Sequence, residues 1–142
     1  MKFKNMLNTL LYFGAIGVSI CLLFFVVTCT WIGYEVKNEC RRAKNQYATK
    51  LPVDQQDCVT ALAATLNDES QSFATRNSAI WALGQLGDER ALSTLQKFYT
   101  GNIPDREPLN STISQYELKK AINLASGGTN LSALFWRYDN QL

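Results

Sequence analysis

The stretch RNSAIWALGQLGDERALSTL, residues 76–95, decides the fold of this chain. Its helical pattern is interrupted only at the GQLGD segment, which predicts two helices joined by a tight turn. Gly84 lets the two helices approach each other closely, because it carries no side chain. Gly87 can adopt the left-handed conformation that ends a helix, and Asp88 can cap the start of the next helix. The stretch therefore predicts a pair of closely packed helices.

Beyond Pro52 the pattern stays helical throughout, and the boundaries carry capping residues rather than strand signals. Three helices are expected before the polar loop 102–110. The first is capped by Asp54 and runs to about residue 67, the second is capped by Ser72 and runs to about residue 86, and the third is capped by Asp88 and runs to residue 100.

Two further helices are expected after the polar loop. Ser114 and Glu117 form a capping box that opens the first of them, and Gly127 ends it. The second presents an apolar face made by Leu131, Leu134, Phe135 and Tyr138. All connections but one are short, so we expect successive helices to pack antiparallel around one shared core.

Residues 76–95 closely resemble the HEAT-like repeat of the phycobilisome-lyase type, with its arginine, alternating alanines, ALGxLGD turn and following ALxxL helix. Residues 58–70 look like the second helix of an earlier repeat, and residues 117–135 look like a degenerate later copy. In that copy Gly128 matches the turn glycine, but Thr129 replaces the aspartate. The resemblance implies a short α-solenoid in which stacked neighbours share a core, and it is specific for the fold while nearly silent on activity.

An uncharged apolar segment precedes this domain. No Asp, Glu, Lys or Arg lies between Lys4 and Glu35, and the segment 10–33 forms about 36 Å of helix, enough to cross a hydrocarbon layer of about 30 Å. A cleaved signal peptide is the rival interpretation, but the apolar run is too long for one and no A-x-A-like cleavage site comes after it. We therefore predict an uncleaved signal anchor.

The predicted organisation is all-α: a transmembrane helix followed by a HEAT-like solenoid of about five antiparallel helices. The divisions are an N-terminal tail 1–6, a transmembrane helix 7–34, a juxtamembrane basic helix 35–50 and the repeat domain 51–142.

The net charge of +2 conceals an uneven distribution. Basic residues flank the apolar segment on both sides, whereas from Leu51 onward ten acidic residues face seven basic ones. A nucleic-acid partner would need a basic patch on the folded domain, so none is expected. Anionic lipid headgroups are the expected neighbours of the basic residues beside the membrane.

Two of the four cysteines lie outside the apolar segment, and they are expected at one interface. Cys40 belongs to an apolar stripe with Val36, Ala43 and Tyr47, and Cys58 adjoins the apolar face of the next helix. A disulfide between them would contribute roughly 3 kcal/mol, and it would place the domain outside the cytoplasm. Two buried free thiols are the alternative.

Two rules on orientation disagree. The segment 35–50 carries five Lys and Arg residues, more than the N-terminal tail, which favours a cytoplasmic domain. A short Met-Lys-Phe-Lys tail before a long apolar run is typical of signal anchors with an exported C-terminal domain. With the cysteines, we predict a cytoplasmic N-terminus and an extracytoplasmic domain, and a cytoplasmic domain is the alternative.

Catalytic motifs are missing from the sequence. The chain has no histidine, no cysteine pair with metal-ligand spacing, no glycine-rich phosphate loop and no G-x-S-x-G elbow. We therefore predict no enzyme activity, no cofactor and no small-molecule substrate, and instead a scaffold or accessory module for an unknown protein partner. The alternative is a single-pass subunit whose membrane helix makes the functional contacts. The candidate partner surface comprises Arg76, Arg90, Tyr99, Arg106, Glu107 and Arg137.

Overall fold

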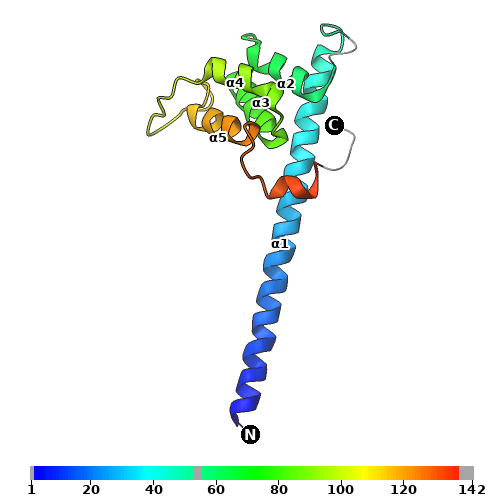
Figure 1. Cartoon of the computed structure of the whole chain (residues 1–142), viewed down its shortest axis with the longest axis vertical. Helices are drawn as coiled ribbons and strands as arrows, with labels where there is room; N and C mark the ends of the chain where they lie inside the picture. The colour runs from blue at the N-terminus through cyan, green and yellow to red at the C-terminus, as the bar shows by residue number, and fades with distance from the viewer. Residues whose placement is uncertain (1, 53–55, 138–142) are drawn as a thin grey trace.

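The computed structural model describes residues 2–52 and 56–137, with the side chains of the first helix described from Leu10 onward. Within these ranges the chain is helical and contains no strand (Figure 1). The α-helices are α1 (Lys2–Tyr47), α2 (Cys58–Asn67), α3 (Phe73–Leu86), α4 (Leu92–Phe98) and α5 (Gln115–Ala125). Two 3₁₀ helices are η2 (Glu89–Ala91), which leads into α4, and η3 (Ser132–Phe135).

α1 is one continuous helix of 46 residues, so the predicted transmembrane and juxtamembrane helices are a single element. Its lower half stands clear of the domain, and its upper half lies against it (Figure 1). From Leu10 onward α1 is long and apolar enough to cross a membrane, and the apolar part is not buried by the domain. Its large side chains between Leu10 and Val27 are exposed, as expected of residues that face lipid.

The predicted apolar stripe of α1 is confirmed. Val36, Cys40, Ala43 and Tyr47 are all buried, and Cys29 extends the stripe further toward the N-terminus. Cys40 and Ala43 belong to the main core, whereas Val36 packs with Trp136 in a smaller cluster. The folded unit therefore includes the upper half of α1 and begins well before residue 51.

The predicted boundaries of α3 are confirmed, whereas the start of α2 is corrected. Ser72 caps α3, and Gly87 ends α3 in the left-handed conformation with φ of 62°. α2 begins later than predicted, because Asp57 is its cap: the Asp57 carboxylate accepts hydrogen bonds from the backbone N–H groups of Val59 and Thr60. The predicted cap Asp54 lies outside the described residues.

The direction of α1 differs from the prediction that successive helices pack antiparallel. Cys40 is bonded to Cys58 at the start of α2, and the Tyr47 hydroxyl reaches Asp68 at the end of α2, so the two helices run in the same sense. This is possible because the connection between Tyr47 and Cys58 is long, and the Gln56 side chain near its end donates to the carbonyls of Ala48 and Leu51. A connection of this length does not impose an antiparallel turn.

Gly84 makes the predicted close contact, but with a different helix. A Cβ at Gly84 would lie 2.7 Å from the Ala121 Cα and 2.8 Å from its Cβ. The partner is therefore α5, rather than α4, the second helix of the matched repeat. This contact fixes the spacing of α3 and α5.

The C-terminal segment departs most from the prediction. In place of a helix with an inward apolar face, it forms η3, which buries Ala133 and Trp136. Leu131, Leu134 and Phe135 are instead 60%, 60% and 54% exposed. Tyr138 lies outside the described residues.

We expect Gly84→Ala to destabilise the domain by roughly 1 to 3 kcal/mol, because α3 and α5 must separate to admit the methyl group. Thermal or denaturant unfolding of the detergent-solubilised protein measures the change. Ser78→Ala, on the same helix, adds no atom and is the matched control. Equal stability of the two variants would show that α3 and α5 can separate enough to admit a methyl group at no cost in stability.

Candidate interaction surface

Two hollows lie on either side of one face of α3. Both are lined by Ala74 and Ser78, so these residues form a ridge between them. The first hollow, of about 380 Å³, lies between α3 and α1. The second, of about 340 Å³, lies between α3, α5 and the loop that precedes α5. We call the ridge and its two hollows the α3 groove.

The two hollows differ in chemistry. The first is lined by polar side chains of α1, among them Glu39 and Arg42, which form an ion pair of 2.8 Å with each other. The second is lined largely by the apolar side chains of Trp81 and Leu109, with Glu117 at its margin. The groove therefore presents a polar end and an apolar end to a binding partner.

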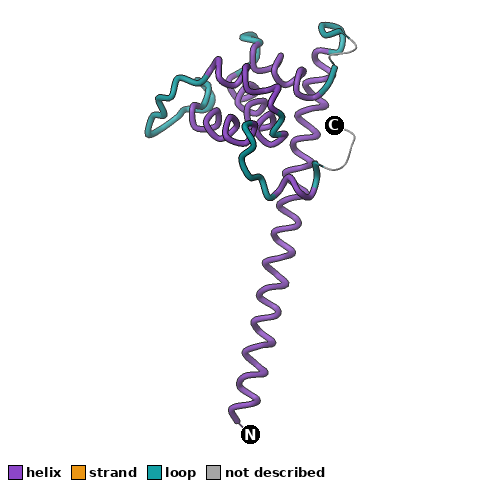
Figure 2. The backbone as a smooth tube through the Cα atoms, in the orientation of Figure 1, coloured by secondary structure: helices purple, strands orange, loops and turns teal. Residues whose placement is uncertain are grey.

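Asn77 builds the wall of the second hollow. Its side-chain amide donates to the carbonyls of Leu109 (3.0 Å) and Thr112 (2.9 Å), and its oxygen accepts from the Ser114 backbone N–H (2.9 Å). The Asn77 side chain is buried, so these three bonds are protected from water. A single α3 side chain thus pins both the end of the long loop, which projects from the domain in Figure 2, and the start of α5.

Glu107 caps α5 rather than facing a partner. Its carboxylate accepts from the backbone N–H groups of Gln115 (2.6 Å) and Tyr116 (3.2 Å) and from the Ser114 hydroxyl. The predicted capping box is half confirmed, because Ser114 accepts from the Glu117 N–H at 3.0 Å. Glu117 pairs with Lys120 instead of reaching back, so the Ser114 backbone N–H is bound by the Asn77 side-chain oxygen, and Glu107 binds the N–H groups of the next two residues.

Arg76 is buried, which corrects its prediction as a partner-surface residue, and the half-buried Arg137 also binds a backbone carbonyl. Arg76 is only 7% exposed and donates to the Leu66 carbonyl at 2.9 Å. Arg137 donates to the Gln85 carbonyl, with its Nε at 3.0 Å. Both acceptors lie in the last turn of a helix, where carbonyl groups lack partners within that helix. The two arginines therefore complete the C-terminal ends of α2 and α3.

The other predicted partner residues have mixed positions. Arg90 is exposed and pairs with Asp88 (2.8 Å) and Asp57 (3.4 Å), and its hydrogen bonds lower the pKa of Asp88. Asp88 caps η2 as predicted, although the cap opens a 3₁₀ turn before α4. Tyr99 is half-buried against the core, and Arg106 is exposed in the long loop. None of these residues lines the α3 groove.

The polar contact between Tyr47 and Asp68 ties the top of α1 to the end of α2, at 2.6 Å. Burial of the phenol, together with its hydrogen bond to the carboxylate, raises the pKa of Tyr47 to about 12. Hydrogen bonds from Ser70, and then from Tyr47, hold the pKa of Asp68 well below its usual range. Asp68 is therefore ionised in the folded protein at every pH near neutrality.

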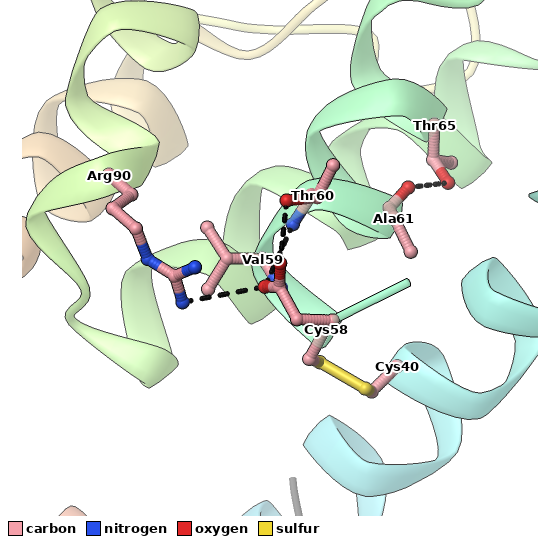
Figure 3. Close-up of a disulfide and its surroundings, with 8 residues drawn as sticks. Cys40, Cys58, Val59, Thr60, Ala61, Thr65 and Arg90 are labelled. Carbon is pink, nitrogen blue, oxygen red and sulfur yellow. Dashed lines mark hydrogen bonds and ion pairs between the residues drawn. A yellow bond between two sulfur atoms is a disulfide. The ribbon is translucent and has the colours of Figure 1, made fainter. Parts of the chain in front are cut away.

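The disulfide between Cys40 and Cys58 joins α1 to the start of α2 (Figure 3). Its Cα atoms are 5.2 Å apart, within the usual range for a disulfide, and both residues are buried. It lies beside the Asp57 cap, so one short segment carries both the covalent link and the helix start.

Among the described residues, no group of His, Cys, Asp and Glu could hold a metal ion. The α3 groove offers ionic and hydrogen-bonding contacts at its polar end, and apolar packing at the other.

Residues 75–100 match the PBS lyase HEAT-like repeat. The match covers most of α3, the Gly87 turn, η2 and α4, so these elements form the repeat unit that the sequence predicted. Neither the curated proteins nor the solved structures gave a match to the chain. The chain is thus an all-helical protein that carries a HEAT-like repeat beside a candidate membrane helix, and repeats of this family are generally non-catalytic.

We expect Cys40→Ser/Cys58→Ser to lower the free energy of unfolding by roughly 3 kcal/mol, because the disulfide closes a loop of 18 residues. Denaturant unfolding of the purified protein, compared with the wild type in reductant, gives the value. Cys21→Ser, in the exposed part of α1, is the control. A wild-type protein that is insensitive to reductant would contradict this expectation.

We expect the domain to lose stability as the pH falls below about 4. In that range Asp68 becomes protonated in the unfolded chain, whereas its lowered pKa keeps it ionised in the folded protein. Acid therefore favours the unfolded chain, which binds the additional proton. Asp68→Asn should be less stable at pH 7 and should depend less on pH between about 5 and 2. Glu69→Gln, at the exposed neighbouring position, should keep the wild-type profile. If stability depends on pH in the same way in all three proteins, Asp68 does not contribute to the loss of stability in acid.

Proposed function

We propose that this protein is a single-pass, membrane-anchored, non-catalytic interaction module that holds a partner protein along the α3 groove. The HEAT-like match supports a role in protein interaction, because repeats of this kind offer extended surfaces built from stacked helices. The observation that carries the proposal is the ridge in the N-terminal half of α3, flanked by hollows of about 380 and 340 Å³.

The groove suits a polypeptide segment with one polar and one apolar end. At the polar end Glu39 and Arg42 offer both charges, while at the apolar end Trp81 offers a large, half-buried ring. Aromatic side chains of this kind are enriched at the centres of protein interfaces. The walls are fixed by the Asn77 bonds and the Gly84 contact, so binding requires little reordering.

The proposed orientation places the domain outside the cytoplasm, with the N-terminus inside. The Cys40–Cys58 disulfide supports this side, because such bonds persist in oxidising compartments. Alkylation of intact cells with a membrane-impermeant maleimide tests the orientation. Labelling of Cys40 and Cys58 only after external reduction agrees with an exported domain, and labelling only after lysis, without reductant, reverses the assignment.

We expect the long side chain of Ser78→Arg to occupy the hollows beside the ridge. Partner recovery should then fall roughly tenfold, which corresponds to a loss of about 1.4 kcal/mol in binding free energy. Recovery is measured by crosslinking in native membranes followed by purification in mild detergent. Ser93→Arg introduces the same side chain on the exposed face of α4, which lines neither hollow, and should leave recovery unchanged. An equal recovery of the partner by both variants argues against the groove.

The alternative is that α1 makes the functional contacts inside the membrane, and its exposed apolar surface favours this second candidate. Replacing the lipid-facing part of α1 by an unrelated apolar helix separates the two. The replacement must end before Phe25, because Cys29 is buried by the domain and Gly33 lies against Trp136. A partner that stays bound shows that this part of α1 is only an anchor.

A further inference from the structure

η3 packs on α1 at a level that the sequence assigned to the membrane. The rings of Phe135 and Phe25 meet edge to face with centroids 5.5 Å apart. A Cβ at Gly33 would lie 2.7 Å from the Trp136 side chain, and Ala133 packs with Trp136 and Val36. The domain therefore reaches down α1 to Phe25, eight residues or about 12 Å below the end of the apolar segment at Gly33.

The segment that carries η3 is held rigidly against the domain at both ends. Asn130 donates to the Gln85 side chain at 2.8 Å, and its own oxygen accepts from the Ala133 N–H. At the other end, Arg137 donates to the Gln85 carbonyl. Both ends of the segment are thus attached to one residue of α3, and η3 is a fixed projection rather than a loose tail.

Apolar side chains nevertheless point away from the domain on this fixed segment. Leu131, Leu134 and Phe135 are the exposed members, at 60%, 60% and 54%. They lie beside exposed apolar side chains of α1, since Phe135 contacts Phe25. Exposed apolar patches that continue one another mark a surface meant for contact. This one continues the lipid-facing surface of α1.

The geometry of the bilayer decides what covers this patch. Residues 5–25 of α1 make about 31 Å of helix, enough for the hydrocarbon layer, so the span need not include residues 26–33. A span that ended at Gly33 would place the irregular backbone around η3 in hydrocarbon, where polar groups without partners are not tolerated. The layer must therefore end near Phe25, with η3 at its boundary. Trp31 and Tyr34, both exposed, then lie in the headgroup region that such rings favour.

We propose that η3 is a membrane-contacting wedge: Leu131, Leu134 and Phe135 enter the domain-side interface of the bilayer and hold the domain against the lipid surface. This inference rests on the proposed membrane anchoring by α1. It adds a second point of attachment, formed by a segment far from α1 in the sequence.

The test uses the full chain with Cys21→Ala and Cys29→Ala, reconstituted in phosphatidylcholine and phosphatidylglycerol vesicles. An environment-sensitive fluorophore is attached at Leu134→Cys, and lipids with a nitroxide near the headgroup quench it. Ser93→Cys on α4 is the matched control on the domain, and Leu22→Cys in the lower half of α1 reports on anchoring with lipids that carry the nitroxide deeper in the acyl chain. Resistance of Cys40 and Cys58 to labelling verifies the fold in each sample.

We expect headgroup-level quenching at residue 134 to be several-fold stronger than at residue 93. Equal, weak quenching at both positions, with residue 22 quenched by the deeper nitroxide, overturns the wedge and leaves the anchor intact. Weak quenching at residue 22 as well overturns the anchoring itself. If the label at residue 134 is not quenched in lipid vesicles but is shielded from solvent in native membranes, the patch contacts a protein. That outcome also overturns the proposal.

Discussion

The packing of α1 against α2 and α3 is the contact on which the rest of the structure depends. The same unbroken helix exposes apolar side chains below Val27 and buries Val36, Cys40 and Ala43 above it. Stacked helical repeats need their first and last members covered, since each buries its face only against a neighbour. The upper half of α1 covers α2 in this way, and the disulfide between Cys40 and Cys58 joins the two helices. The anchor and the core are one piece of secondary structure.

Much of the fold could be predicted because its signals are local. The Ser72 cap, the Gly87 turn and the apolar stripe of α1 each depend on residues a few positions apart, and the structure confirms all three. The direction of α1 relative to α2 could not be predicted this way. It depends on the connection between Tyr47 and Cys58, which is long enough to permit a parallel or an antiparallel arrangement of the two helices.

The candidate surface was predicted less well, because exposure was inferred from residue type. Arginine is usually exposed, yet Arg76 and Arg137 bind carbonyl groups at the ends of α2 and α3. Every helix has such unpaired carbonyls, and no side-chain pattern shows which arginine will reach them. The α3 groove was missed for a related reason. Ala74 and Ser78 are small residues that no sequence motif singles out. They matter because both line the two hollows, which are completed by residues distant in the sequence.

Because α1 is one continuous helix, a change in the tilt of its N-terminal half also changes the orientation of the domain. The helix has no break between its exposed apolar part and the domain, and Gly33, which lies between the two, is braced by Trp136. A transmembrane helix adjusts its tilt when the surrounding bilayer becomes thicker or thinner. A rigid extension must carry the same angular change to whatever is attached at its far end. In the proposed membrane-anchored arrangement, the thickness of the membrane thus sets the angle at which this domain meets its neighbours.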